Sequence, residues 1–385
     1  MSVFDTLPLF VHAYGPLAMG NAWVEDLTPS ISSYSHTLAR IGGYWSASVG
    51  VKGTQNYLEE WFENGLGRRI VTMDEAGIVC WDGFVDKITL TLGGFSIARG
   101  PLTNMANRVL SVYAPLNTAV NPPTVGARTV TTWEEDLTSQ YKYGILEKII
   151  SAGNTTVADA EEQRDAFLLE RSTPAIGHEF SPISSGGEMS MTLECSGRSG
   201  WLNAYVYIQD AVSGVSTVTD KITDIINYSP NAYFQVSPNY IDGSLSLVPA
   251  FEADYNVAWT LIEELAKRRS INGEMYEFGV YANGRAIYKV IPNTITYMQH
   301  MADTAQRLFT MSGAEVKPWN ILPGRWMMYS GIMVGRSITS TLRGDPRLSL
   351  IESVEYQAPM DFRLSGYKDM TLAERLRMLG IWGSV

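Results

Sequence analysis

The feature that most constrains this chain is the alternation of apolar and polar residues in several short segments. Residues 45–51 carry an apolar or small side chain at every second position, and residues 88–92 and 189–195 follow the same pattern. A period of two is typical of β-strands that bury one face. The chain is therefore predicted to be dominated by β-sheet, with one side of each sheet left to face solvent.

Helical patterns are fewer and separate the β-rich segments. Residues 55–64 predict a short helix with Leu58, Trp61 and Phe62 on one face, closed by Gly65. The segment 117–182 is predicted to be helical and free of strands, and residues 254–269 predict a further helix.

Two tight connections predict hairpins. Residues 74–77 form a four-residue loop that ends in glycine and lies between two apolar runs. Asn283-Gly284 lies between the β-patterned runs 275–281 and 285–291, and Asn-Gly is the residue pair that favours a two-residue hairpin turn.

Composition excludes several classes of protein. With 45% hydrophobic residues in 385, the chain can build real cores and is not disordered as a whole. Two cysteines, Cys80 and Cys195, exclude a disulfide framework and are expected to be buried thiols. The net charge of -11 disfavours tight binding to nucleic-acid phosphates. The uncharged run 6–24 contains prolines and glycines, so no membrane insertion is expected. The first basic residue is Arg40, so no basic region precedes an apolar stretch and no secretory signal is expected.

No constellation of residues indicates catalysis. The four histidines, His12, His36, His178 and His300, lack metal-ligand spacing, and the glycine pairs lack phosphate-loop spacing. The acidic run 134–136 is expected at the start of a helix, where acids offset the helix dipole. We therefore expect no enzymatic activity, no catalytic residues, no metal and no cofactor.

Three stretches resemble the central hub proteins of bacteriophage tails and baseplates. The first is 40–115, with NYLEEWFENGLG at 56–67 and WDGFV at 81–85. The second is SQYKYGILE at 139–147 followed by the helix predicted at 158–171, and the third is MTLECSG at 191–197 followed by a predicted helix. The resemblance implies a β-dominated α+β fold with two tail-tube-like β-barrel or sandwich domains and helical and α+β insertions.

The predicted division of the chain follows the resemblance and the residue patterns together. It comprises an N-terminal arm, two tube-like domains of which the second is discontinuous, a helical connector, an α+β insertion and a C-terminal tail helix. The arm is 1–24 and the first tube-like domain is 25–120, while the second tube-like domain is 186–250 together with 305–365. The helical connector is 121–185, the α+β insertion is 251–304 and the tail helix is 366–385.

The resemblance also implies partners and a location. Three copies would form a ring of pseudo-sixfold symmetry in the virion tail, joining a hexameric tail tube to distal tip, spike or fibre proteins. DNA would pass through without tight binding, and acidic channel walls would repel its phosphates. Leu58, Trp61 and Phe62 are candidates for subunit contacts, with ordinary core packing as the alternative.

Two other functions remain open from the sequence. A carbohydrate-binding or carbohydrate-cleaving β-protein would use exposed tryptophans to stack on sugars, and the candidates are Trp23, Trp133, Trp201 and Trp326. Glu134 and Glu135 would be its candidate catalytic acids. A receptor-binding protein of the tail tip is not separable from a hub by sequence.

Overall fold

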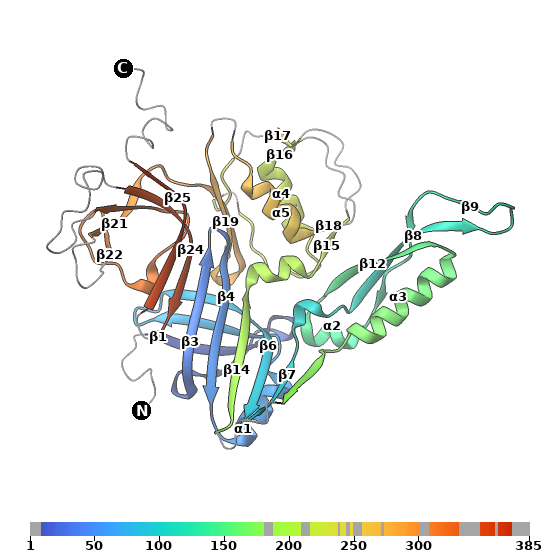
Figure 1. The fold of residues 1–385 in the computed structure, drawn as a ribbon, viewed down its shortest axis with the longest axis horizontal. Coiled ribbons are helices and arrows are strands. Elements are labelled where there is room, and N and C mark those ends of the chain that lie inside the picture. Colours follow the sequence, from blue (N-terminus) through green and yellow to red (C-terminus); the bar gives the residue numbers. More distant parts are fainter. Residues whose placement is uncertain are drawn as a thin grey trace.

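The computed structural model describes residues 9–180, 188–208, 216–237, 239–243, 247–248, 256–270, 273–300, 308–330, 347–358 and 361–371. Strands dominate, and most of them belong to one curled 16-stranded sheet (Figure 1). The fold is therefore a β-rich α+β fold, as the alternating patterns predict.

The large sheet joins segments that are far apart in the sequence. Its main path runs β2-β1-β5-β6-β14-β4-β3-β24-β23-β21-β22, while β7, β13, β19, β20 and β25 branch from it. Its strands are β1 Leu9–Pro16, β2 Trp23–Asp26, β3 Ile31–Ala39, β4 Ile41–Lys52, β5 Arg68–Asp74, β6 Val79–Leu92, β7 Phe95–Arg99, β13 Ile176–Phe180, β14 Ser190–Gly197, β19 Tyr276–Tyr281, β20 Arg285–Val290, β21 Ile295–His300, β22 Leu308–Thr310, β23 Trp326–Ser330, β24 Arg347–Gln357 and β25 Asp361–Thr371.

Five α-helices and three small sheets complete the described part of the chain. The helices are α1 Gln55–Asn64, α2 Leu137–Tyr143, α3 Val157–Arg171, α4 Val218–Asn227 and α5 Ala258–Lys267. The small sheets contain β8 Arg108–Asn117, β9 Thr124–Val125, β10 Thr129–Val130, β11 Glu134–Glu135 and β12 Glu147–Thr155; β15 Val206–Tyr207 with β18 Asn256–Val257; and β16 Ser216–Thr217 with β17 Leu247–Val248.

Both predicted hairpins are confirmed. Between β5 and β6, the Asp74 carboxylate accepts hydrogen bonds from the backbone N–H groups of Ala76 and Ile78, each at 2.9 Å. Between β19 and β20, Tyr281 pairs with Arg285, so the connection has three residues, one more than a two-residue turn. Its last two, Asn283 and Gly284, have φ values of 61° and 78°, the left-handed conformation that this pair adopts easily.

The predicted N-terminal arm is wrong for residues 9–24. Here β1 pairs with β2 on one side and with β5 on the other. Leu9, Val11 and Ala13 are fully buried on the core side of the sheet. The uncharged run was not recognised as a strand because its outward positions also carry aromatic side chains rather than polar ones.

The strand-free helical connector predicted at 121–185 is also wrong. The region contains α2 and α3, but β12 pairs in parallel with β8, and α3 packs on both strands. Together they form an arm that projects from the body of the protein (Figure 1). The four-residue spacing of Tyr141, Ile145 and Ile149 resembles a helix, yet α2 ends at Gly144 and Ile149 lies in β12.

The structure does not keep the two predicted tube-like segments apart. Strand β14, assigned by sequence to the second segment, lies between β6 and β4 of the first. Helix α4, from the same segment, packs with α5 and the β19–β20 hairpin in one apolar cluster. The α+β insertion predicted at 251–304 therefore extends back to α4, because neither helix can bury its apolar face alone.

The predicted C-terminal tail helix begins too early. Residues up to Thr371 continue β25, which pairs antiparallel with β24. The helix expected at 372–379 lies outside the described residues.

Candidate functional site: a hydroxyl-rich sheet face

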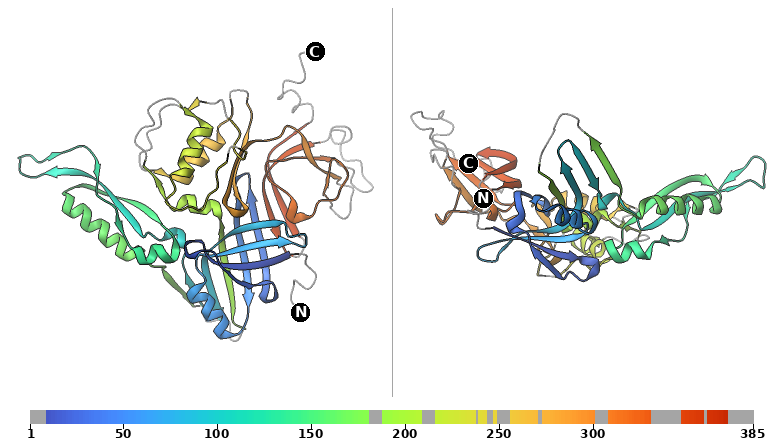
Figure 2. Two further views of the ribbon diagram at one scale, coloured as in Figure 1. Left: turned by 180° about the vertical axis from the view of Figure 1, so that it is seen from behind. Right: turned by 90° about the horizontal axis from the view of Figure 1, so that it is seen from below.

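The centre of the large sheet has two very different faces. On β3, β4 and β14 one face carries buried apolar side chains such as Tyr34, Val49 and Leu193, which pack in the main core. The core is closed on its far side by β1, β5 and α1 (Figure 2). The opposite face, here called the open face, is not covered by a second sheet in the described residues, which distinguishes it from an ordinary sandwich layer.

Hydroxyl side chains cover the open face in register. Thr37 on β3 lies opposite Ser46 on β4, which lies opposite Ser196 on β14, so one row crosses three strands. Further rows extend the pattern from β25 to β7. The hydroxyl-bearing residues of this face are Ser33, Ser35, Thr37, Ser46, Ser48, Thr89, Thr91, Ser96, Ser190, Thr192, Ser196, Ser353 and Ser365.

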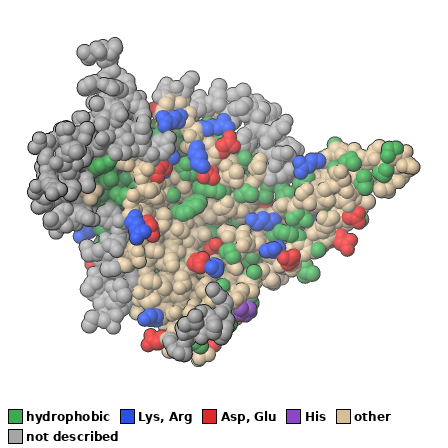
Figure 3. Space-filling view, viewed as in Figure 1, with side chains coloured by type: hydrophobic (Ala, Val, Ile, Leu, Met, Phe, Trp, Pro, Cys, Tyr) green, Lys and Arg blue, Asp and Glu red, His purple; other side chains and the backbone are tan. Residues whose placement is uncertain are grey.

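Charged groups on this hydroxyl-rich face come as neighbours of opposite sign. Lys87 on β6 forms an ion pair with Glu194 on β14, with 2.8 Å between Nζ and Oε1. Arg363 on β25 lies opposite Glu355 on β24 in the strand register. The space-filling view accordingly has few charges over β3, β4 and β14 (Figure 3). This face is therefore polar and locally balanced in charge rather than acidic.

Part of the negative charge of the chain lies away from this face, on the arm. Helix α3 of the arm carries Asp159, Glu161, Glu162, Asp165 and Glu170 within fifteen residues. A net charge summed over a whole chain does not reveal on which surface it lies, so the charge argument had no means of locating these acids.

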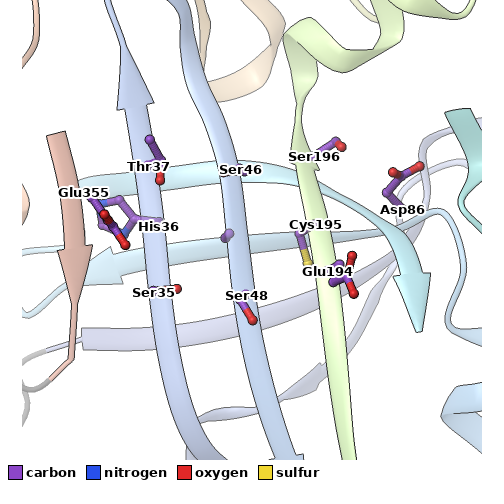
Figure 4. Close-up of a pocket in the computed structure, with 11 residues that line it drawn as sticks. Ser35, His36, Thr37, Ser46, Ser48, Asp86, Glu194, Cys195, Ser196 and Glu355 are labelled. Carbon is purple, nitrogen blue, oxygen red and sulfur yellow. The ribbon is translucent and has the colours of Figure 1, made fainter. Parts of the chain in front are cut away.

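A hollow in the open face lies across four strands, β24, β3, β4 and β14 (Figure 4). Ser35, Ser48 and Glu194 line it together with other residues of the hydroxyl-rich face. These side chains can bind water and neutral polar surfaces, because each hydroxyl can donate and accept a hydrogen bond.

His36 and Cys195 lie behind this hollow and face the core. The Nδ1 atom of His36 is 3.0 Å from the Tyr34 hydroxyl, and burial lowers the pKa of the imidazole to about 3. Burial raises the pKa of the Cys195 thiol, so the sulfur stays protonated and unreactive near neutral pH. Both side chains are therefore held uncharged by their burial, as is usual for residues that pack in a core.

Asp86 lies at the β6 side of the hollow and is held by a loop. Its carboxylate accepts hydrogen bonds from the backbone N–H of Thr103 at 3.0 Å and from the Thr103 hydroxyl at 3.3 Å. Burial raises the pKa of this carboxyl, while the hydrogen bonds from Thr103 oppose the increase. These bonds fix the start of the arm to the sheet.

The candidate contact residues Leu58, Trp61 and Phe62 are not on the surface. All three are buried in the main core, and the Trp61 indole donates a hydrogen bond to Glu25 at 2.8 Å. The alternative, ordinary core packing, describes them correctly, because α1 closes the end of the sheet and needs its apolar face to do so.

The tryptophans proposed for sugar stacking do not form a common surface. Trp201 and Trp326 are buried, and Arg108 stacks on Trp133 at 4.8 Å. Only Trp23 of the four is largely exposed, at 54%.

The two candidate catalytic acids are engaged in ion pairs. Glu135 pairs with Arg108 at 2.8 Å and Glu134 with Arg164 at 3.5 Å. Both acids lie in β11 rather than at a helix start, and Asp136 caps α2 instead.

Sequence reasoning missed the hydroxyl-rich face, although a signal was present. Serine or threonine recurs at every second position in 33–37, 46–48 and 190–192. The apolar positions of each alternation predicted the strands, and the residue types at the polar positions between them were not interpreted.

Among the described residues, no group of three or more His, Cys, Asp or Glu side chains is close enough together to hold a metal ion. None of the described helices combines the length and the apolar character needed to cross a bilayer.

Comparison with known proteins gave few similarities. No family model and no curated protein sequence matches the chain. One solved structure with a similar arrangement is the tail protein from Neisseria meningitidis MC58, at 8% sequence identity over 91% of this chain and 92% of that one, with a TM-score of 0.36. A similarity of this size does not establish a shared fold or function.

Proposed function

We propose that the chain is a structural, non-enzymatic component of a bacteriophage tail, three copies of which form the hub ring between the tail tube and the distal tip or spike. The hydroxyl-rich face would line the channel through which DNA passes. The observation that carries this proposal is the open face itself, which is rich in hydroxyl side chains, has its charges in neighbouring pairs of opposite sign and is supported from behind by the main core. The sequence resemblance to tail hubs points in the same direction.

The chemistry of the face suits a surface along which DNA slides. Proteins hold DNA through clustered Lys and Arg, and they hold single strands by stacking bases on aromatic rings. On the hydroxyl-rich face Lys87 is neutralised by Glu194, and the register places hydroxyl side chains at most of the remaining positions. Such a surface can stay hydrated without retaining phosphates or bases.

The topology is compatible with the expected ring. The open sheet combines β3, β4 and β6 of the first predicted tube-like segment with β24 and β25 of the second. Three copies that each contribute strands of both predicted segments to the channel wall would offer a hexameric tube repeated contact positions. The partners implied are therefore two further copies of this chain, a hexameric tube and the distal tip proteins.

The proposal is tested first by the state of assembly. The full chain is purified and its mass is measured by light scattering over a range of concentrations, with negative-stain images of the same fractions. Three copies around a central hole are expected. A monomer that persists at high concentration and in the presence of tube or tip proteins would contradict the proposal.

A second experiment tests which surface lines the channel. Ser48→Lys with Ser196→Lys places two cations on the hydroxyl-rich face, whereas Thr118→Lys with Thr124→Lys adds the same charge to the exposed end of the arm. At low salt the first variant should retain linear duplex DNA and the second should not. Equal retention by both variants would argue against a channel lined by this face.

A further inference from the structure

The open sheet has an unpaired edge at each end within the described residues. Its path runs β13-β7-β6-β14-β4-β3-β24-β25, eight strands in which each neighbour is antiparallel to the next. In the described part of the chain β13 pairs only with β7, and β25 pairs only with β24. Unpaired strand edges offer rows of backbone N–H and C=O groups to another chain.

The β13 end of this sheet also leaves apolar surface uncovered. We call the C-terminal half of β6 (88–92) together with β7 and β13 the wing; it forms one end of the open sheet, where β6 pairs with β14 on one side and with β7 on the other (Figure 2). On the side opposite the hydroxyls, Leu92, Phe95 and Ile176 are 49%, 42% and 57% exposed. Near the body the same side is covered, since Ile88 is fully buried. The wing thus extends the core face of the sheet past the point where α1 can cover it.

The two free edges match each other in strand direction and in the side of the sheet on which their residues lie. Because the path contains an even number of alternating strands, β13 and β25 run in opposite directions, so that β13 of one copy can continue antiparallel from β25 of the next. Gly177 on β13 and Ser365 on β25 both belong to the open face by register. Joining these edges would therefore continue the hydroxyl-rich face without a break.

We infer that the wing is the docking surface for a second copy of this chain, with β13 of one copy paired to β25 of the next and the exposed apolar side of the wing packed on that neighbour. This inference rests on the proposed ring function and specifies its contact. Use of two different edges makes the contact head-to-tail, and repeated head-to-tail contacts close into a ring of three when each contact turns the next copy by a third of a full rotation. Self-pairing of β13 would instead give a two-fold dimer and leave β25 unused.

The position of the arm agrees with this contact. The arm is inserted between β7 and β13, and its base is tied to the sheet by Gly100, whose N–H bonds to the Ala175 carbonyl at 3.0 Å. A copy docked at the β13 edge would consequently lie beside the base of the arm.

Cross-linking between two variants, each with one added cysteine, tests the edge pairing. Gly177→Cys is tolerable because an added Cβ meets no atom within 4 Å, and Ser365→Cys replaces an exposed side chain. Both native thiols are buried, so the unmodified chain reports the background. With a short bis-maleimide, we expect products only when the two variants are mixed, and covalent trimers when both substitutions are in one chain.

The outcomes separate this inference from the proposed function. Self-cross-linking of Gly177→Cys would overturn the head-to-tail contact. Absence of products from an assembly whose mass equals three copies would also overturn it, while leaving the ring intact. A chain that stays monomeric under all conditions would contradict the ring itself.

A matched pair of charge variants tests the apolar side of the wing. Ile176 on the wing and Ile78 in the β5–β6 turn are equally exposed, each at 57%. Ile176→Glu should weaken self-association by about tenfold or more, the effect of losing one central apolar contact, whereas Ile78→Glu should associate normally. Because both residues are on the surface, both variants should keep the melting temperature of their monomers. Equal association by the two variants would overturn the inference.

Discussion

Acidification should destabilise the fold through His36, which lies directly beneath the hydroxyl-rich face. The imidazole is buried and shares a hydrogen bond with the Tyr34 hydroxyl at 3.0 Å. Burial disfavours its charged form and lowers the pKa from an ordinary value of 6.5 to about 3. The folded protein therefore holds this side chain neutral across the range in which an exposed histidine takes up a proton.

The sign and the size of the effect follow from proton linkage. Below about pH 6.5 the unfolded chain binds a proton at His36 that the folded chain does not bind, so the free energy of unfolding decreases as the pH falls towards 3. At pH 4.5 the medium is about two pH units below the ordinary pKa. At about 1.4 kcal/mol per unit, the loss attributable to His36 is about 2.7 kcal/mol relative to neutral pH.

Urea unfolding at neutral pH and at pH 4.5 measures this loss. His36→Phe removes the titrating group, and its lost hydrogen bond to Tyr34 changes stability equally at both pH values. The unmodified protein should lose about 2–3 kcal/mol more than His36→Phe on acidification, while His178→Gln, at an exposed position, should behave like the unmodified protein. Parallel pH dependence of the unmodified protein and His36→Phe would refute the reasoning.

Three further substitutions test the packing that supports the open face. Asp82 is fully buried and forms ion pairs with Arg69 at 2.7 Å and with Arg198 at 3.1 Å. Asp82→Ala should therefore lower the free energy of unfolding by about 3–5 kcal/mol in urea titrations. A loss below about 1 kcal/mol would contradict the described ion pairs. Trp61→Ala should cost about 3–5 kcal/mol and lower the melting temperature without altering subunit stoichiometry in the molecules that fold. An added Cβ in Gly197→Ala would collide with a carbonyl oxygen of β4, so little folded protein should be recovered; normal yield and circular dichroism would contradict that close approach.

Local structure was predictable where one short segment determines it. The helix predicted at 55–64 has the bounds of α1, because its apolar spacing and Gly65 act within a few residues. Asn283-Gly284 likewise determines its own turn. Long-range pairing was not predictable in this way: the alternation in 189–195 indicates a strand, but contains nothing that selects β4 and β6 as neighbours.

The candidate site was less predictable than the fold. Leu58, Trp61 and Phe62 were proposed for subunit contacts because large aromatic residues are common in interfaces, and the same property makes them common in cores. The exposed Leu92 and Phe95 of the wing carry weaker sequence signals, since strand alternation does not reveal where a sheet outgrows its cover. Only the structure shows where α1 ends in space, and therefore which part of the neighbouring strands it covers.

A density map of the assembled protein at side-chain resolution tests the central proposal most directly. We expect three copies around an open channel whose wall is formed by β3, β4 and β14, with Ser46, Ser48 and Ser196 facing the lumen. Particles without a central opening, or a map in which these serines are packed against another protein, would contradict it.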